Sequence, residues 1–287
     1  AVGTSEPSAT DAPNVPAKPG AVAGDGKATV SITPPVAGAN PSSYTITSSP
    51  EGKQCTINVP ATTCDVTGLT NGTPYTFTAV ATNWVDSSLA SVASDAVTPG
   101  KVFASSWKTN NMSPGSSEAN QIKLPLPHGL TYNFYVSWGD GTTDHITSYN
   151  QAETTHTYEL AGTKDISITG IIDGWRFADG GDKLKLLNIS SWGPLKFGGG
   201  DGYFYGAANM TVSAADKPDL SATASMFNAF LGASNFDANV TDWDVTGIFD
   251  MTNAFKGTTR FTGTGLDTWN VNFVQQMDSM FEASGMN

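Results

Sequence analysis

Few residues of this 287-residue chain are of types that carry out covalent chemistry, and their sequence surroundings do not favour it. A serine or cysteine nucleophile needs a histidine base and an orienting acid, yet the chain holds only three histidines. No Gly-x-Ser-x-Gly turn, His-Glu-x-x-His helix or dinucleotide-binding glycine pattern occurs, and Gly198–Gly202 lacks the Lys-Ser or Lys-Thr of a phosphate-binding loop. The sequence does not exclude a pair of carboxylates for glycoside hydrolysis, because the separation of the two groups in space decides that chemistry. The sequence nevertheless predicts that the chain is not an enzyme and has no cofactor.

Asp140 and Asp144 are the candidates for a metal site. Calcium takes about six to eight hard oxygen ligands, and two carboxylates with nearby carbonyls supply only part of such a set. Asp140 lies in Gly139-Asp-Gly141, where a carboxylate caps its own tight turn. We therefore expect Asp140 to form a turn, with calcium as the weaker alternative. His156 begins a strand-like segment, and we expect it to be structural rather than a base or a ligand.

The two cysteines, Cys55 and Cys64, lie nine positions apart in a stretch rich in strand-forming residues. A metal site would need more ligands near them, and no histidine is close in sequence. A disulfide that closes a short loop fits better and would stabilise the fold by about 2–3 kcal/mol. This pairing indicates an oxidising compartment. The alternative is a pair of unpaired, buried thiols.

The composition favours short strands and excludes two classes of partner. Lys and Arg total 14 against 26 Asp and Glu, and the formal net charge of −12 repels nucleic acid and anionic membranes. The 30 Gly and 16 Pro residues are accompanied by abundant Thr, Ser, Asn and Asp, whereas the straight-chain residues that long helices need are scarce. No run of about eighteen apolar residues occurs, so we expect no membrane insertion.

Residues 16–100 read as a first β-sandwich domain, preceded by a Pro/Ser/Ala-rich linker over residues 1–15. Apolar and polar residues alternate in short segments about ten residues apart, with Gly, Pro and Asn between them. These segments are residues 27–33, 44–47, 56–59, 64–69, 75–82 and 91–98.

The segment from Leu69 to Phe77 resembles the corner of a fibronectin type III domain. The resemblance implies that the Tyr75 hydroxyl bonds back to the backbone near Leu69 and fixes the crossing between the two sheets. No Arg-Gly-Asp tripeptide occurs, so recognition of the integrin type has no support. By itself such a domain is usually a spacer.

Residues 101–175 read as a second domain. Phe134–Gly141 is followed by His156-Thr-Tyr158 and by the alternating segment from Gly162 to Gly170. Trp138 and Tyr158 are expected to face the core. The pattern resembles PKD-like domains, which are β-sandwiches of extracellular proteins.

Residues 176–287 contain a repeat with a period of 25 and then 26 residues. A Leu or Val precedes each Met by six positions, and each Phe follows its Met by four. A period of this length predicts a solenoid of the leucine-rich class with one short helical turn per repeat. Trp243 and Trp269 are spaced by the same period. We expect their rings to stack in the core, and a ligand platform is the alternative. The predicted repeat core is Leu220, Met226, Phe230, Val245, Met251, Phe255, Val271, Met277 and Phe281.

Trp243-Asp-Val-Thr246 with Met251-Thr-Asn-Ala-Phe255 resembles the repeats of BspA-type bacterial surface proteins, as does the next unit. The resemblance implies attachment to a host or neighbouring cell. Because the sequence stops inside a repeat, we expect the repeat domain to be truncated.

These observations predict a mainly β protein: two β-sandwich modules followed by a leucine-rich-repeat-like solenoid. We expect an extracellular or cell-surface adhesin segment that binds a protein or glycan on another cell or host surface, with the sandwiches as a stalk. One alternative is an accessory, non-catalytic region of a secreted polysaccharide- or protein-degrading enzyme. Another is a structural spacer without a ligand.

Overall fold

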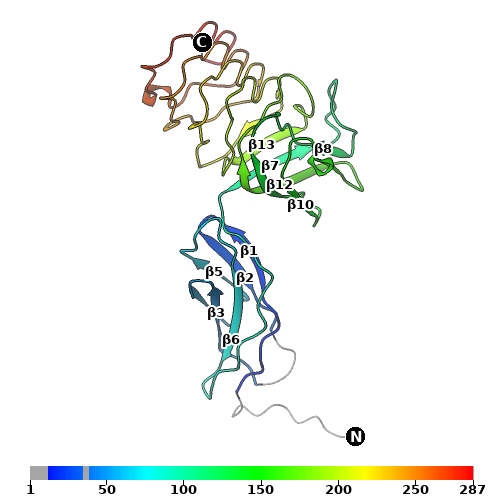
Figure 1. The fold of residues 1–287 in the computed structure, drawn as a ribbon, viewed down its shortest axis with the longest axis vertical. Coiled ribbons are helices and arrows are strands. Elements are labelled where there is room, and N and C mark those ends of the chain that lie inside the picture. Colours follow the sequence, from blue (N-terminus) through cyan, green and yellow to red (C-terminus); the bar gives the residue numbers. More distant parts are fainter. Residues whose placement is uncertain (1–11, 35–38, 287) are drawn as a thin grey trace. The chain divides into compact units, whose positions relative to one another are not determined.

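The computed structural model describes residues 12–34 and 39–286 and divides the chain into two compact units, Ala1–Lys101 and Val102–Asn287 (Figure 1). Most of the predicted linker, residues 1–11, lies outside the described residues. The border between the units follows Lys101, and the predicted end of the first domain is residue 100. In the described residues no helix is long and apolar enough to cross a bilayer.

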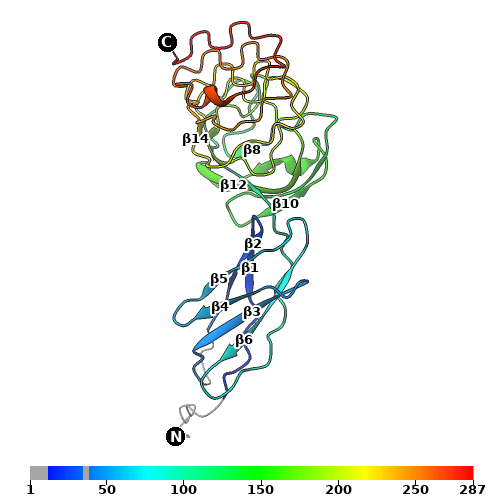
Figure 2. The same ribbon diagram turned by 90° about the vertical axis from the view of Figure 1, so that its left-hand side faces the viewer.

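The first unit consists of two antiparallel sheets of three strands each, in the orders β1-β2-β5 and β4-β3-β6 (Figure 2). Alternate side chains point inward, so Val30 and Tyr44 are buried together with Ile46 and Phe77. The strands are β1 (Gly20–Gly24), β2 (Lys27–Ser31), β3 (Ser43–Ser49), β4 (Gln54–Asn58), β5 (Thr63–Thr67) and β6 (Thr76–Thr82).

The last predicted strand, residues 91–98, does not form as a regular strand. Ser91 and Ser94 of this segment, with Ser88 just before it, lie along the edge of β6 instead: their hydroxyls accept hydrogen bonds from backbone amides of β6 at 2.9–3.0 Å. The amides of the same serines donate to carbonyls of β6 at 2.8–2.9 Å. Each serine therefore satisfies one amide and one carbonyl of β6, so the edge of the sheet is covered without a strand ladder.

Two predicted contacts of the first unit are present. The Tyr75 hydroxyl accepts a hydrogen bond from the Thr70 amide at 2.9 Å, one residue beyond the predicted Leu69. Cys55 on β4 and Cys64 on β5 form a disulfide with a Cα–Cα distance of 6.1 Å. Because β4 and β5 belong to different sheets, the disulfide joins the two layers of the sandwich.

The second unit is built on a six-stranded sheet in the order β10-β9-β12-β7-β13-β14, with β8 and β11 as a separate antiparallel pair. Bounds of its elements are β7 (Val102–Lys108), β8 (Gln121–Lys123), β9 (Tyr132–Ser137), β10 (Thr143–Ile146), η1 (Ala152–Thr154), β11 (Thr155–Thr157), β12 (Thr163–Ile172), β13 (Leu186–Ser191), β14 (Thr211–Val212) and η2 (Leu266–Thr268).

The predicted border between residues 175 and 176 lies inside this unit. Strand β13 comes from the predicted third domain and pairs with β7 of the predicted second domain. The aromatic core is also continuous across the border, since the Trp175 ring lies 5.2 Å from that of Phe103 and 6.0 Å from that of Phe177. The predicted second and third domains therefore share one hydrophobic core.

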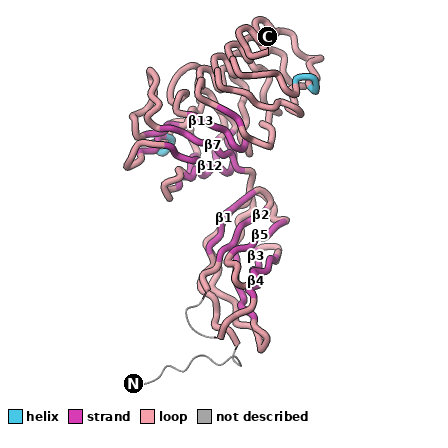
Figure 3. The backbone as a smooth tube through the Cα atoms, turned by 180° about the vertical axis from the view of Figure 1, so that it is seen from behind, coloured by secondary structure: helices cyan, strands magenta, loops and turns pink. Residues whose placement is uncertain are grey.

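From residue 177 onward the backbone forms a stack of rungs, drawn mostly as loops in Figure 3. The amides of Phe204, Phe230 and Phe255 donate to the carbonyls of Ala229, Ala254 and Met280, which lie 24 or 25 residues further along the chain. The amide of Phe177 donates in the same way to Tyr203. The residues before Leu220, the first position of the predicted repeat core, thus contribute rungs as well.

The predicted helical turn between each Met and Phe is absent. Asn228, Asn253 and Ser279, two residues after each Met, all have a φ of 54° in the left-handed region. A left-handed residue ends a right-handed helix, so the backbone turns and its amides bond to the next rung instead. Over residues 176–286 the described helical structure is the single 3₁₀ turn η2.

The side chains of the repeat pack between rungs. Leu220, Met226, Phe230, Val245, Met251 and Phe255 are buried, and Phe281 is partly buried. The Phe230 and Phe255 rings stack at 5.4 Å, as do the Trp243 and Trp269 rings at 6.4 Å. Val271 and Met277, by contrast, are 40% and 43% exposed, because they lie on the last described rung and have a neighbouring rung on one side.

Candidate functional site

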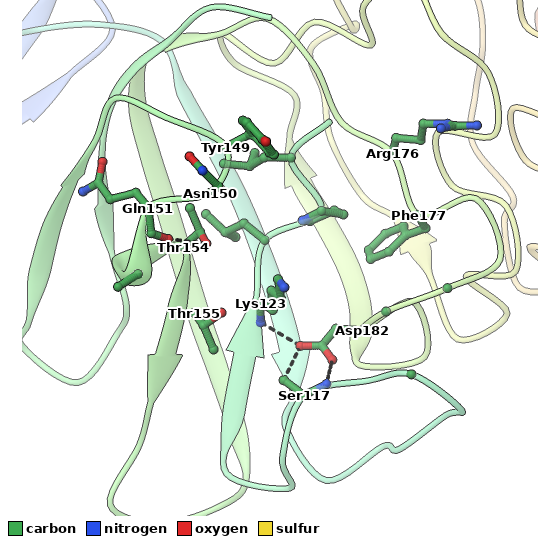
Figure 4. A pocket seen from close by; sticks show the side chains of 17 residues that line it. Ser117, Lys123, Tyr149, Asn150, Gln151, Thr154, Thr155, Arg176, Phe177 and Asp182 are labelled. Carbon is green, nitrogen blue, oxygen red and sulfur yellow. Dashed lines mark hydrogen bonds between the residues drawn. The ribbon is translucent and has the colours of Figure 1, made fainter. Parts of the chain in front are cut away.

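A pocket of about 550 Å³ opens in the second unit, where the first rung meets β8 and η1 (Figure 4). Small-molecule sites in proteins span roughly 300–1,000 Å³, so the volume suits a small ligand. Figure 4 shows Tyr149 and Asn150 on one side of the pocket and Arg176 and Phe177 on the other.

The floor of the pocket is apolar and fixed by backbone hydrogen bonds. Leu124, Leu126 and Phe177 contribute buried side chains. The Leu124 amide donates to the Thr154 carbonyl at 2.9 Å, and the Arg176 amide donates to the Pro125 carbonyl at 2.8 Å. The segment that follows β8 is therefore held between η1 and the first rung.

Tyr149 lies at the rim, in the loop between β10 and η1, and is 38% exposed. Its ring meets the His128 ring edge-on at 5.0 Å. Gln151 closes the loop: its Oε1 accepts from the Thr147 amide at 3.0 Å, and its Nε2 donates to the His145 carbonyl at 2.7 Å. The side-chain amide of Gln151 thus positions the loop that carries Tyr149.

Asp182 is the carboxylate of the lining, and it is fully buried. It accepts hydrogen bonds of 2.7 Å from the Ser117 amide, the Ser117 hydroxyl and the Lys123 amide. These bonds tie the loop before β8 to the loop before β13. Asp182 therefore builds the wall of the pocket.

Lys185 is also fully buried, with its Nζ 3.3 Å from Asp182. The ammonium donates to the carbonyls of Ser117, Glu118 and Gln121 and to the Ser117 hydroxyl, all at 2.8–2.9 Å. Burial lowers the pKa of Lys185 from its ordinary value, and the Asp182 charge opposes this effect. Because every bond of the pair is internal, we assign it a structural role.

The charged groups at the rim are Lys123 and Arg176, both exposed. Arg176 extends away from Tyr149 (Figure 4), and its Nε and Nη2 donate to Oδ1 of Asp201 at 2.9 and 2.5 Å. Asp201 lies 25 residues further along the chain, on the next rung. The ion pair between Arg176 and Asp201 links two rungs, and the aliphatic part of the Arg176 side chain lines the pocket.

The residues proposed from sequence lie elsewhere in the unit. Oδ1 of Asp140 accepts from the Thr142 amide and hydroxyl at 3.0 and 2.5 Å, and Oδ2 meets Nε2 of His156 at 2.8 Å. Burial raises the pKa of Asp140, but the bonds from Thr142 and His156 outweigh it and leave the pKa well below its ordinary value. The His156 ring stacks on the Trp138 ring at a centroid distance of 4.8 Å. Nε1 of Trp138 donates a hydrogen bond to Asp144 at 2.8 Å.

Both weak calcium candidates are thus engaged in hydrogen bonds within the protein. No cluster of three or more metal-binding side chains occurs over residues 12–34 and 39–286. The pocket was missed by sequence reasoning. Its residues come from five separate segments, and none of them lies in a chemical motif.

Family models match two segments of the chain. Residues 17–94 match the fibronectin type III domain, which confirms the assignment made from the Tyr75 corner. Residues 201–287, the regular part of the rung stack, match a family described as "Mycoplasma protein of unknown function". Each match covers less than half of the chain. A search of curated proteins gives no match.

Solved structures resemble parts of the chain only weakly. The FN1–FN3 domains of chicken CNTN1 are 18% identical over 56% of this chain, with a TM-score of 0.28. A crystal structure of titin domains is 19% identical over 31%, with a TM-score of 0.26, and a chitinase from Bacillus thuringiensis is 15% identical over 53%, with a TM-score of 0.23. The chain spans 62%, 32% and 27% of those structures respectively.

Proposed function

We propose that the chain is a non-catalytic adhesion segment of a cell-surface protein that binds a protein or glycan on another cell or host surface. The second unit would bind, through a leucine-rich-like solenoid of the BspA type joined to a PKD-like segment. The fibronectin type III domain would be a spacer. The observation that carries the proposal is the hydrogen-bonded stack of rungs at a spacing of 25 to 26 residues.

A stack of this kind repeats each surface position on every rung. One such row is Ala224, Phe249 and Gln275, which are all exposed. Its members are joined by backbone bonds: the Phe249 amide donates to Ala224 at 2.9 Å, and the Gln275 amide donates to Phe249 at 2.7 Å. Repeated weak contacts along such a row add up to useful avidity.

An extracellular location is supported by the fibronectin type III domain and the Cys55–Cys64 disulfide. Disulfides persist in oxidising compartments and are rare in the cytosol. Attachment to a cell surface is part of the proposal.

Binding of the labelled whole chain to animal and bacterial cells tests the proposal. We expect saturable binding that Phe249→Glu weakens, since Phe249 is 38% exposed on the row and a carboxylate there would need desolvation on contact. Val22→Glu is the matched control, because Val22 is 69% exposed on the first unit. It should bind as the unchanged chain does.

Two results would contradict the proposal. Absence of binding to every cell type would leave the spacer alternative. Selective binding to insoluble polysaccharide, without cells, would favour an accessory region of a degrading enzyme.

A further inference from the structure

We propose that the pocket between Tyr149 and Phe177 binds a short saccharide. This inference deepens the proposed function and rests on it, because it selects a glycan from the two classes of ligand and adds a site for it in the same unit as the exposed row that contains Phe249. The argument depends on the shape of the pocket, the chemistry of its lining and the rigidity of its walls.

The pocket offers one apolar and one polar surface to a ligand. Leu124, Leu126 and Phe177 form a buried apolar floor, and Tyr149 presents an aromatic ring at the rim. A pyranose ring has an apolar face of C–H groups, which packs against such a ring and floor. Its hydroxyls lie around the edge of the ring and need polar partners.

Polar partners line the opening. Asn150 and Thr155 contribute amide and hydroxyl groups, and Lys123 contributes an ammonium. The Asn150 Oδ1 accepts from the Ser148 hydroxyl at 2.7 Å, and Nδ2 of the same side chain is a hydrogen-bond donor. Neutral hydroxyls and amides, with the cationic side chains of Lys123 and Arg176 at the rim, match the donor and acceptor groups of a saccharide.

The lining carboxylate neither repels nor protonates a ligand. Asp182 is 0% exposed and receives three hydrogen bonds of 2.7 Å. Glycoside hydrolysis requires two carboxyl groups that flank the bond to be cleaved. The residues that line the pocket include a single, buried carboxylate, so the chemistry of this site is binding.

The walls of the pocket are held in place before any ligand arrives. Gln151 fixes the Tyr149 loop through two backbone bonds, and the Asp182–Lys185 pair fixes the loop around Ser117. A rigid site avoids the entropic cost of ordering loops on binding. Weak, specific sugar binding then requires few direct contacts.

The test is binding of the whole chain to an array of neutral and acidic glycans, followed by calorimetry with the strongest ligand. Tyr149→Ala should weaken binding at least about tenfold, because it removes the aromatic contact at the rim of the site. Ala152→Trp should abolish binding by filling the mouth from the exposed start of η1. The second variant keeps every buried side chain.

Tyr135→Ala is the matched control. Tyr135 is an exposed tyrosine of the same unit that also contacts a histidine, since its ring stacks on His145 at 4.4 Å outside the pocket. It should bind the glycan as the unchanged chain does. Near-ultraviolet circular dichroism checks that each variant is folded.

The outcomes separate this inference from the proposed function. If the chain binds cells but no glycan, or if the pocket variants bind glycan normally, the pocket assignment is wrong and adhesion stands. If the chain binds neither cells nor glycans, both proposals are wrong. The pocket assignment is supported if Tyr149→Ala and Ala152→Trp lose glycan binding while Tyr135→Ala keeps it.

Discussion

Individual polar residues decide how the pocket is built, and the buried Asp182–Lys185 pair is the main case. Two charges with no exposed surface lose their hydration, and in this protein seven short hydrogen bonds to Ser117, Glu118, Gln121 and Lys123 replace it. Nothing in the local sequence distinguishes these two residues from exposed neighbours such as Asp179. Their burial follows from the loops that the fold brings together, so sequence alone could not predict it.

We predict that Lys185→Met lowers the free energy of unfolding of the second unit by about 3–5 kcal/mol, because it leaves the Asp182 charge buried without its partner. Urea denaturation followed by tryptophan fluorescence measures the loss. The double variant Lys185→Met with Asp182→Asn should lose less than the sum of the single changes. Lys256→Met, which breaks an exposed pair with Glu282, is the control and should cost less than about 1 kcal/mol. Equal losses for Lys185 and Lys256 would contradict a structural role for the buried pair.

At the scale of elements, patterns of apolar residues predicted most strands of the first unit and the spacing of the rungs. They failed where polar side chains replace a ladder, as Ser88, Ser91 and Ser94 do along β6. They failed again between Met and Phe, where a spacing of four suggested a helical turn. There the left-handed residue after each Met turns the backbone toward the next rung. Both departures depend on hydrogen bonds between segments that are distant in sequence, which periodicity does not contain.

Asn253 tests how strongly the left-handed position shapes a rung. Its φ is 54°, its amide donates to Asp278 at 2.9 Å, and its Nδ2 donates to Asn228 at 3.1 Å. Both Asn253→Gly and Asn253→Val remove the side-chain bond, but only valine resists the left-handed region. We expect valine to lower the free energy of unfolding by about 1–2 kcal/mol more than glycine, as measured in urea. Thr252→Val places the same side chain one residue earlier, where φ is not positive, and should have a small effect. If Asn253→Val lowers the free energy of unfolding no more than Asn253→Gly does, the left-handed conformation at residue 253 is not what shapes the rung.

At the scale of the whole molecule, the residues that the structure describes form two separate hydrophobic cores. One belongs to the fibronectin type III sandwich, and the other runs from Phe103 to Met280 through the six-stranded sheet and the rungs. The sequence predicted three domains because the PKD-like and repeat patterns differ in period. The structure joins these two patterns, since β13 pairs with β7 and Trp175 packs on Phe103. A change of period therefore marked a change of architecture within one compact unit.

The disulfide allows the two cores to be examined separately. Cys55 and Cys64 lie in the first unit, and removing their bond by Cys55→Ala with Cys64→Ala should destabilise that sandwich by about 2–3 kcal/mol through the greater freedom of its unfolded state. For a domain of this size the loss corresponds to a fall in Tm of roughly 10 °C or more. Because the second unit has its own core, we expect calorimetry to show two transitions, of which only one shifts. Lys185→Met should shift only the transition of the second unit, so each variant identifies the transition that belongs to the unit it changes. A single transition that moves in both variants would mean that the cores unfold together, and the fibronectin type III domain would then be more than an independent spacer.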